Sequence, residues 1–509
     1  MSESWEIKNF LEIRNNHLCI DSADTVELAR DYGSPLFVFS ESRIRHNIAR
    51  LQRAGDAIPC PLKICYAAKA MSTMGILQAV REAGIDIEVN SGGELWKALN
   101  AGFTGEQIVF NGTSKEIWEI ENAINAGIYA IQVDSLYELS LIEETGKRLG
   151  KRANVSLRLV PEIESGTHSG LQTAMLTSKF GMMPDEAFSA FHAYKDSPHL
   201  DLCGIHLHVG SQNPDPVVYS EALTMLFESM VRIFKETGIR LKHINLGGGF
   251  PVNYLRDEDR YSQEHQPGQD RAGHQQMLSA HFEPFDAIRA AWEQVRLKST
   301  VTGSEHLLTN LTVLLEPGRS IISDAGICLT SVRNKKSRPL TESNIELHEQ
   351  LAKAQRSKQK AGISFGIVDY ESGIVSHGLI DEHWLLTDAG FNILLSMETY
   401  KWYYDLISAD RPSAEHNFPY KVAGPLCDGG DVYFDIEGMN RLPDHRLLPE
   451  NLKPGEVLAL LNCGAYSLAQ ASQYNGRFLP AVVLVCSSGE VKQIRKRDSF
   501  EDLIANDIY

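Results

Sequence analysis

Eight short apolar runs, separated by stretches with helical periodicity, are the feature of this sequence that most limits its fold. The runs are rich in β-branched residues and cover residues 62–67, 86–89, 107–110, 129–133, 155–160, 202–209, 243–246 and 312–315. Short strands that are apolar throughout and alternate with helices are typical of a parallel sheet. Eight such units predict an α/β fold with a (β/α)8 TIM-type barrel over residues 40–318.

The stretch at residues 135–149 shows the helical pattern well. Its charged residues lie on one side, and Gly150 is expected to cap its C-terminus. The predicted apolar face consists of Leu136, Leu139, Ile142 and Leu149.

Beyond the eighth run, the sequence changes to apolar runs that have no regular helices between them. Three of them, at residues 383–387, 457–461 and 481–485, predict strands of a C-terminal antiparallel β domain. Two polar stretches, near residues 256–276 and 334–360, are expected to be insertions, and we assign no chemistry to either.

The composition limits the partners of the chain. A content of 43% hydrophobic and 23% charged residues is typical of a soluble globular protein. A length of 509 residues exceeds that of one ordinary domain and predicts two domains. The formal net charge of −17 disfavours nucleic acid, because phosphates are bound by clustered lysine and arginine. A polar start and the lack of an apolar run of about 18 residues predict a cytoplasmic protein without a membrane partner. Eight scattered cysteines without a CxxC pair predict neither structural zinc nor disulfides.

Chemically active residues follow the predicted strands. In barrels of this type the active site lies at the carboxyl ends of the strands. The residues at these ends include Lys69, Asn111, Asp134, His208, Ser211, Gly247, Gly248, Gly249, Glu316, Gly318 and Arg319. We therefore expect one site that several strands share.

Lys69 closes the segment ICYAAKA at the end of the first predicted strand. An ammonium group buried there has its pKa lowered, which favours formation of an imine with an aldehyde. A lysine whose charged end reaches the solvent is the alternative, and Lys69 by itself does not decide between the two.

Two neighbouring strands end in candidate anion-binding segments. The run from Gly247 to Gly249 leaves backbone N–H groups open to an anion, and Gly318 with Arg319 adds donors from the next strand. Barrels commonly bind phosphate at their seventh and eighth strands. Plain turns are the alternative, but two such segments side by side favour phosphate.

Glu316 lies just before the second of these segments. A carboxylate paired with a pyridine nitrogen keeps the ring protonated and makes it a strong electron sink, as the loss of CO₂ requires. An ion pair with Arg319 or a helix cap is the alternative. His208 is a candidate to stack on such a ring. With His206 it also resembles a metal-binding pair, but no carboxylate or cysteine set completes a metal site, and we expect no metal.

In the predicted β domain, residues 424–431 read GPLCDGGD. The segment combines turn-forming residues with the thiol of Cys427 between carboxylates, which suits a proton donor better than a nucleophile of low pKa. A tight loop without chemistry is the alternative.

Together these motifs resemble those of a known family. The segments YAAKA, NSGGEL, NGTSK, VDS, SKFG, HLHVGSQ, NLGGGF, EPGR, GPLCDGGD and GAY occur in the order of the fold-type III decarboxylases, the family of diaminopimelate and ornithine decarboxylases related to alanine racemase. The resemblance covers almost the whole chain. It implies an enzyme that decarboxylates an amino acid with pyridoxal 5′-phosphate, through a quinonoid intermediate. It also implies that residues 1–39 and 319–509 form a β domain like the C-terminal domain of alanine racemase, which completes the active site.

The resemblance further implies a role for each matched residue. Lys69 forms the imine, His208 stacks on the ring, Glu316 pairs with the pyridine nitrogen and Cys427 donates a proton. The implied cofactor contacts also include Ser211, Gly247, Gly248, Gly249, Gly318, Arg319 and Tyr466, and the implied substrate contacts are Arg319, Tyr400, Asp428 and Tyr466. Family members are homodimers with shared active sites, so Lys69 of one chain is expected to work with Cys427 of the other.

The substrate is less well determined, because the sequence departs from the diaminopimelate enzymes. They carry Cys-Glu where this chain has Cys427-Asp428, and Ser396 replaces the arginine of their Arg-Pro-x-x-Tyr segment, which ends here at Tyr400. Cys-Asp-Gly is the ornithine-type version, yet the second acidic residue of the ornithine enzymes falls on Met397. A diamino acid or an amino-acyl conjugate is therefore expected as the substrate.

Two other functions remain as alternatives. An amino-acid racemase is disfavoured, because racemases of this fold have an arginine at the pyridine nitrogen where this chain has Glu316. A non-catalytic homologue that binds pyridoxal phosphate is disfavoured, because Lys69 and Cys427 are both retained.

Overall fold

The computed structural model describes residues 6–160, 179–254, 278, 280–339, 381–436 and 441–508. The chain forms two compact units. The barrel unit consists of Ile44–Val252 and His281–Ile322, and the β unit consists of Met1–Arg43, Asn253–Ala280 and Ser323–Tyr509.

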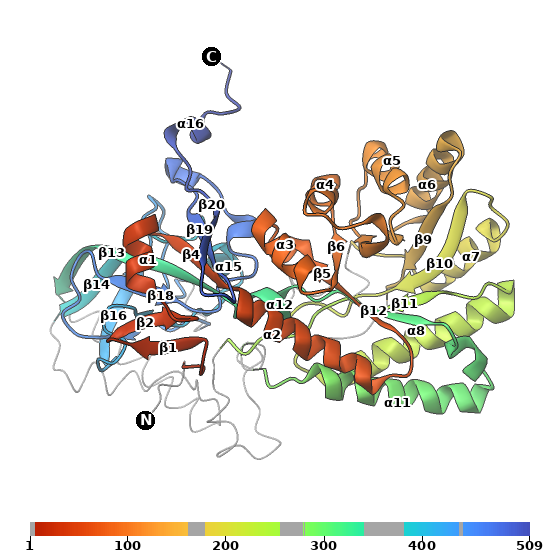
Figure 1. Ribbon diagram of the computed structural model, residues 1–509, viewed down its shortest axis with the longest axis horizontal. Helices are drawn as coiled ribbons and strands as arrows, with labels where there is room; N and C mark the ends of the chain where they lie inside the picture. The colour runs from red at the N-terminus through yellow and green to blue at the C-terminus, as the bar shows by residue number, and fades with distance from the viewer. Residues whose placement is uncertain are drawn as a thin grey trace. The chain divides into compact units, whose positions relative to one another are not determined.

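The barrel unit contains a closed barrel of parallel strands, which confirms the predicted (β/α)8 architecture (Figure 1). Each strand pairs with the next along the chain, and β12 pairs with β5 to close the ring. The strands are β5 (Leu62–Ala67), β6 (Asp86–Val89), β7 (Ile108–Phe110), β8 (Ala130–Val133), β9 (Ala153–Arg158), β10 (Leu200–His206), β11 (His243–Asn245) and β12 (Thr312–Leu315). The largest difference from the predicted runs is at β10, which ends at His206 rather than at Val209.

Helices lie outside these strands, as Figure 1 shows. They are α3 (Met74–Glu82), α4 (Gly92–Asn100), α5 (Ile117–Ala126), α6 (Leu136–Leu149), α7 (Pro184–Tyr194), α8 (Pro216–Thr237) and α11 (Pro284–Thr302). Two short helices at the strand ends matter for the site: η2 (Ala68–Ala70) follows β5, and α12 (Arg319–Ile322) follows β12.

Helix α6 shows how local sequence sets these elements. The Ser135 side chain accepts a hydrogen bond from the Glu138 N–H at the N-terminus, and Gly150 ends the helix in the left-handed conformation at φ 62°. Leu139 and Ile142 are buried as predicted. Leu136 is 37% exposed, so its place on the apolar face was wrong. It is the first residue of the helix and follows the end of β8 at Val133 by three positions.

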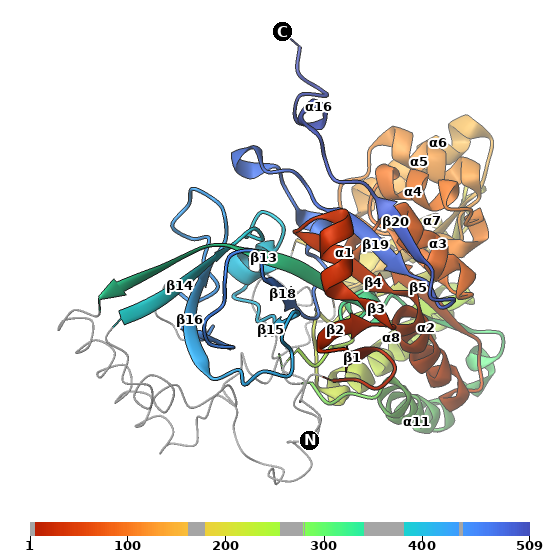
Figure 2. The ribbon, with the colours of Figure 1, turned by 60° about the vertical axis from the view of Figure 1, so that its left-hand side comes forward.

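The β unit is built on one large sheet, in which β13, β14 and β16 run side by side (Figure 2). Its strands are β4 (Leu36–Ser40), β13 (Gly326–Pro339), β14 (Asp381–Thr387), β15 (Leu406–Ser408), β16 (Phe418–Ala423), β17 (Arg446–Leu448), β18 (Val457–Leu460), β19 (Ala481–Val485) and β20 (Val491–Arg495). The predicted antiparallel sheet is confirmed, with two parallel pairs in addition, β4 with β19 and β14 with β16.

The two predicted insertions are mostly outside the described residues. Residues 256–276 lie wholly outside them. Of residues 334–360, only 334–339 are described, and they form the end of β13.

A second, small sheet lies at the start of the chain. It consists of β1 (Leu11–Arg14), β2 (His17–Ile20) and β3 (Ala23–Asp24), and α1 (Thr25–Tyr32) follows directly. Its apolar residues, among them Leu11 and Leu18, share a buried cluster with Val38 of β4, Leu329 of β13 and Val483 of β19. The hydrophobic effect therefore ties the small sheet to the large sheet.

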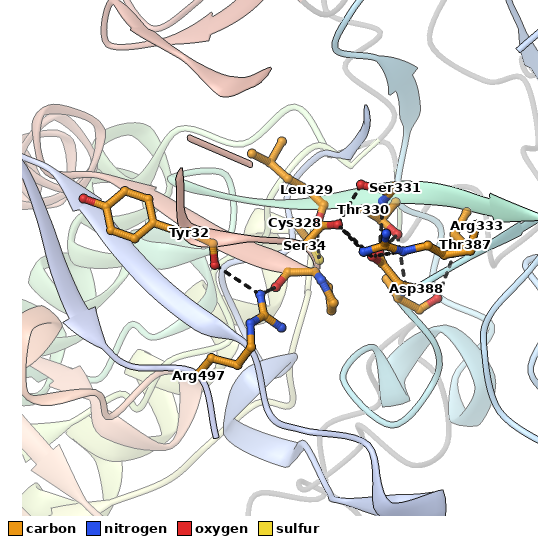
Figure 3. Close-up of polar contacts among 12 residues, drawn as sticks. Tyr32, Ser34, Cys328, Leu329, Thr330, Ser331, Arg333, Thr387, Asp388 and Arg497 are labelled. Carbon is orange, nitrogen blue, oxygen red and sulfur yellow. Dashed lines mark hydrogen bonds and ion pairs between the residues drawn. The ribbon is translucent and has the colours of Figure 1, made fainter. Parts of the chain in front are cut away.

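The Asp388 carboxylate connects three neighbouring segments of this sheet (Figure 3). Its Oδ1 accepts hydrogen bonds from the Thr330 hydroxyl at 2.7 Å and the Ser331 N–H at 3.0 Å, both on β13. Its Oδ2 accepts from the Ser34 hydroxyl at 2.7 Å, just before β4, and from Arg333 Nε at 2.9 Å. One side chain thereby fixes the end of β14 to β13 and to the chain entering β4.

Replacing Asp388 by Ala is expected to lower the free energy of unfolding of the β unit by about 2 to 4 kcal/mol, because several donors lose their acceptor at once. Urea unfolding followed by circular dichroism measures the change. Asp381→Ala, at the other end of β14, is the control, since Asp381 takes no part in these contacts. Equal unfolding midpoints for the two variants would contradict the role of Asp388.

None of the helices in the described part of the chain is long and apolar enough to cross a membrane.

Candidate active site

The backbone ladder of the barrel continues past the strand ends and sets the positions of the residues there. The Leu246 N–H donates to Leu314 O at 3.0 Å, the Glu316 N–H to Gly247 O at 2.7 Å, and the Ala67 N–H to Pro317 O at 3.0 Å. The segments that carry Lys69, the glycine run and Glu316 are therefore joined edge to edge.

Glu316 is buried and is held by neutral amides. Its Oε1 accepts from Asn245 Nδ2 at 2.6 Å, and its Oε2 accepts from Asn111 Nδ2 at 2.9 Å. The predicted alternative of an ion pair with Arg319 is not formed. Burial, and after it the charge of Glu88, raise the pKa of Glu316 to about 7.

The glycine run allows a close approach of three backbone segments. A Cβ at Gly248 would lie 2.3 Å from the Glu316 carbonyl oxygen, and one at Gly249 would lie 2.3 Å from the Gly210 carbonyl oxygen. Gly249 also has φ +92°, a conformation that residues with a side chain rarely adopt. Only glycine fits this turn, so the turn has no side chains that would cover its backbone N–H groups.

His208 is held by this turn, because its Nδ1 accepts a hydrogen bond from the Gly248 N–H at 3.1 Å. The ring proton of the neutral histidine is therefore on Nε2. Burial, followed by the charges of Lys69 and Arg158, keeps the pKa of His208 well below its ordinary value. His206 instead faces Glu316, with Nε2 3.5 Å from Oε2. Among the described residues, no group of three or more His, Cys, Asp or Glu side chains is arranged to hold a metal ion.

Arg319 and Ser211 come together at the same edge of the barrel. The buried guanidinium donates to the Ser211 hydroxyl from Nε at 3.4 Å and from Nη2 at 3.3 Å. Gly318 packs against β5, since a Cβ there would lie 3.1 Å from the Cβ atoms of Ala67 and Ala70. Arg319 is thereby kept beside the short helix that carries Lys69.

Lys69 lies in η2 with an exposed side chain, which agrees with the alternative of a lysine whose charged end reaches the solvent. Strand β5 ends at Ala67 and η2 begins at the next residue, so Lys69 lies past the end of the strand. Its charge still acts on the site, because it lowers the pKa of Glu316 and of His208.

The loop at residues 424–431 belongs to the β unit and wraps around Asp431. The buried Asp431 carboxylate accepts from the N–H groups of Phe391 and Leu426, each at 2.8 Å. The two carboxylates of the motif therefore differ in kind. Asp431 shapes the loop, whereas Asp428 and Cys427 are exposed at its tip.

The tip of this loop is held by residues 474 and 475. The Cys427 N–H donates to Asn475 Oδ1 at 2.7 Å, and the Tyr474 hydroxyl donates to Asp428 Oδ2 at 3.2 Å. A Cβ at Gly430 would lie 3.3 Å from Asp428 Oδ1 and 3.6 Å from Glu398 Oε1. Two carboxylates thus lie close to one point of the loop.

Tyr400 and Tyr466 also belong to the β unit, and both are partly buried. Tyr400 ends the short helix α15 (Leu395–Thr399). Tyr466 has φ 57° and follows the turn at Gly464, whose N–H donates to Ser323 O at 2.9 Å.

Comparison with known proteins assigns the family. The sequence profile described as "Pyridoxal-dependent decarboxylase, pyridoxal binding domain" matches residues 44–323. The chain is similar to the diaminopimelate decarboxylase of Methanothermobacter thermautotrophicus, with 32% identity over 96% of this chain and 95% of that one. The chain belongs to the pyridoxal-dependent decarboxylases.

Solved structures agree with this family assignment. A crystal structure of diaminopimelate decarboxylase from M. jannaschii in complex with L-lysine has a TM-score of 0.77 and 29% identity, and the similarity covers 98% of each chain. The diaminopimelate decarboxylase of Bacillus subtilis is 28% identical over 97% of this chain and 96% of that one.

The cofactor of this decarboxylase is pyridoxal 5′-phosphate, and the barrel residues fit it. Lys69 would supply an amine for its aldehyde. The glycine turn, which a Cβ would obstruct, together with Ser211 and Arg319, would supply donors for a phosphate. The buried Glu316 would supply a carboxylate for a protonated ring nitrogen.

Sequence reasoning missed two residues of this decarboxylase site, Glu88 and Asn245. Both are fully buried polar residues within apolar strands, Glu88 in the segment DIEV of β6 and Asn245 in HIN of β11. A polar side chain in a strand buried on both faces was the signal available, since such a group requires a partner.

Replacing Gly249 by Ala is expected to weaken cofactor binding by about tenfold or more, because the turn must open to accept a Cβ. Fluorescence titration of cofactor-free protein with pyridoxal phosphate measures the dissociation constant. Gly238→Ala is the control, because Gly238 has a similar φ of +74° but no atom within 4 Å of the new Cβ. Unchanged affinity in Gly249→Ala would contradict the role of the turn.

Proposed function

We propose that this chain decarboxylates an amino acid that carries a second amino group on its side chain. The observation that carries the proposal is the exposed Asp428 carboxylate beside Cys427 at the loop tip; Glu398 lies near the same point, and its Oε2 is paired with Lys401 Nζ at 2.6 Å. A carboxylate recognises a cationic group, and Ser396 stands where the resemblance places an arginine for a distal carboxylate. Relatives named diaminopimelate decarboxylase, one solved with L-lysine, support a diamino acid.

We further propose how the residues of the chain serve the reaction. When bound, pyridoxal phosphate accepts the electron pair that the departing carboxylate leaves on the substrate. Lys69 anchors the cofactor covalently through Nζ, His208 supports its ring, and Glu316 holds a proton at its ring nitrogen. The phosphate is held by Ser211, Gly247, Gly248, Gly249, Gly318, Arg319 and Tyr466.

The substrate and its proton are handled by residues of the β unit together with Arg319 of the barrel unit in this proposal. Arg319 and Tyr466 orient the substrate at the reacting end, and Tyr400 and Asp428 orient it at the distal end. The Cys427 thiol delivers a proton to the carbon that has lost CO₂, for which its exposed position at the loop tip is suited. Proton delivery from a fixed position restores one hydrogen for each CO₂ released.

The enzyme acts as a cytoplasmic homodimer in this proposal, with Cys427 of one chain serving Lys69 of the other. The family resemblance supports the dimer. The racemase and the non-catalytic homologue find no support, because the relatives named above are decarboxylases.

Lysine, ornithine and diaminopimelate are the first substrates to test with cofactor-loaded protein, and CO₂ release is the measurement. Asp428→Asn is expected to raise KM for the preferred diamino acid about tenfold, because a charged hydrogen bond is lost. Glu415→Gln, an exposed acidic residue of the same unit, is expected to leave KM unchanged. Absence of CO₂ with the cofactor bound would refute the decarboxylase, and racemised substrate without CO₂ would establish the racemase instead.

The shared active site has its own test in mixed dimers. Lys69→Ala and Cys427→Ala are each expected to abolish or strongly reduce activity. Unfolding and refolding the two variants together is expected to restore about a quarter of wild-type activity, because a mixed dimer has one intact site. A mixture that stays inactive while it forms dimers would show that the two residues act within one chain.

A further inference from the structure

Glu88 is a buried carboxylate to which the reaction described above assigns no task. It lies on β6, is 0% exposed, and points into the barrel that carries Glu316. Its Oε1 accepts a hydrogen bond from Asn111 Nδ2 at 2.8 Å. Its Oε2 has no hydrogen-bond partner within the described part of the chain. Burying a carboxylate in this way destabilises a fold, so a purely structural role does not explain it.

Asn111 joins Glu88 to Glu316 through a single nitrogen. Its Nδ2 donates to Glu88 Oε1 at 2.8 Å and to Glu316 Oε2 at 2.9 Å. Ionised carboxylates only accept hydrogen bonds, so the amide nitrogen rather than the amide oxygen must face them. Both protons of this nitrogen are then used, which fixes the distance between the two acids.

The other groups around Glu316 do not replace this negative charge. His206 on β10 is buried, and burial with Arg158 keeps its pKa well below the ordinary value, so it is neutral at physiological pH. Asn245 on β11 is neutral. Arg158 on β9 and Lys69 after β5 are the nearby cations, and Cys65 on β5 is kept protonated by burial, which raises its pKa. Glu88 is the acid that acts on Glu316 most strongly.

We propose that Glu88 is a positioning residue for decarboxylation. Its negative charge, held at a fixed distance from Glu316 by the Asn111 amide, keeps Glu316 a strong acceptor for the proton at the cofactor ring nitrogen. The inference rests on the role proposed for Glu316. A nearby negative charge favours the protonated form of any group beside it. Without Glu88, the proton between Glu316 and the ring is held less firmly, and the ring accepts electrons less readily.

The first test uses the cofactor-free full chain. The infrared band of the protonated Glu316 carboxyl, identified by its loss in Glu316→Gln, is titrated with pH. The expected midpoint is about 7 in the wild type. In Glu88→Gln the midpoint is expected to fall by about one pH unit or more. A fall of this size is expected when a negative charge one amide away from Glu316 is removed. The control is Ser156→Ala, which changes a buried polar side chain on a different strand, β9, and is expected to leave the midpoint unchanged.

A second variant covers the case in which Glu88→Gln does not fold. Glu88→Asp keeps the charge but places it one methylene farther from Asn111, so its midpoint is expected between those of the wild type and Glu88→Gln. An unchanged midpoint in every variant that folds would overturn the proposal.

The second test uses the cofactor-loaded enzyme. Glu88→Gln is expected to lower kcat about tenfold with little change in KM, because in this proposal Glu88 acts on the cofactor ring through Glu316 and not on the substrate. The pH midpoint of the cofactor absorbance is expected to shift downwards as well. A rise in KM at unchanged kcat would overturn the proposal.

The two tests separate this inference from the proposed function. A shifted Glu316 midpoint in cofactor-free protein that releases no CO₂ from any diamino acid would refute the function and leave the coupling of Glu88 to Glu316 standing. Release of CO₂ with unchanged midpoint and unchanged kcat in Glu88→Gln would refute only the inference.

Discussion

The closed ladder of backbone hydrogen bonds around the parallel strands is the constraint on which the active site depends. Pairing of β12 with β5 brings the last strand of the barrel beside the first, although they are far apart in the chain. The ladder continues through the Glu316 N–H to Gly247 O and the Ala67 N–H to Pro317 O. Lys69, the glycine turn and Glu316 are therefore gathered by the backbone and need no side-chain contacts with one another to be assembled.

Burying charge in the barrel unit is costly, and the structure meets that cost in two ways. Lys115 and Glu138 form a buried ion pair at 2.7 Å, and the ammonium donates to two carbonyl groups in addition. Glu316 receives only neutral amides, and the acid nearest to it is Glu88. A carboxylate left without a cation of its own remains available to a protonated ring nitrogen, whereas one already paired with Arg319 would not be.

Much of the fold followed from local patterns, because a helix cap or a buried strand depends mainly on adjacent residues. Ser135, Gly150 and the run at β5 gave correct boundaries, and the residues after the strands gave most of the barrel site. The exposure of Leu136 was not predicted and that of Lys69 was left open, because the short helix after β5 and the first turn after β8 are set by how neighbouring segments pack. Glu88 and Asn245 were missed because their partners lie on other strands.

The sequence by itself determined the alternation of strands and helices, the order of the motifs and the residue types at the strand ends, since each of these is a property of short segments. The tertiary structure decided which acidic residues are buried and shape the fold around them, and which are exposed. Asp431 and Asp428 are three positions apart, yet one is buried as the centre of its loop and the other is exposed at the tip. Glu88 and Glu316 meet through Asn111 only because the barrel closes, and this burial and proximity give Glu316 its raised pKa.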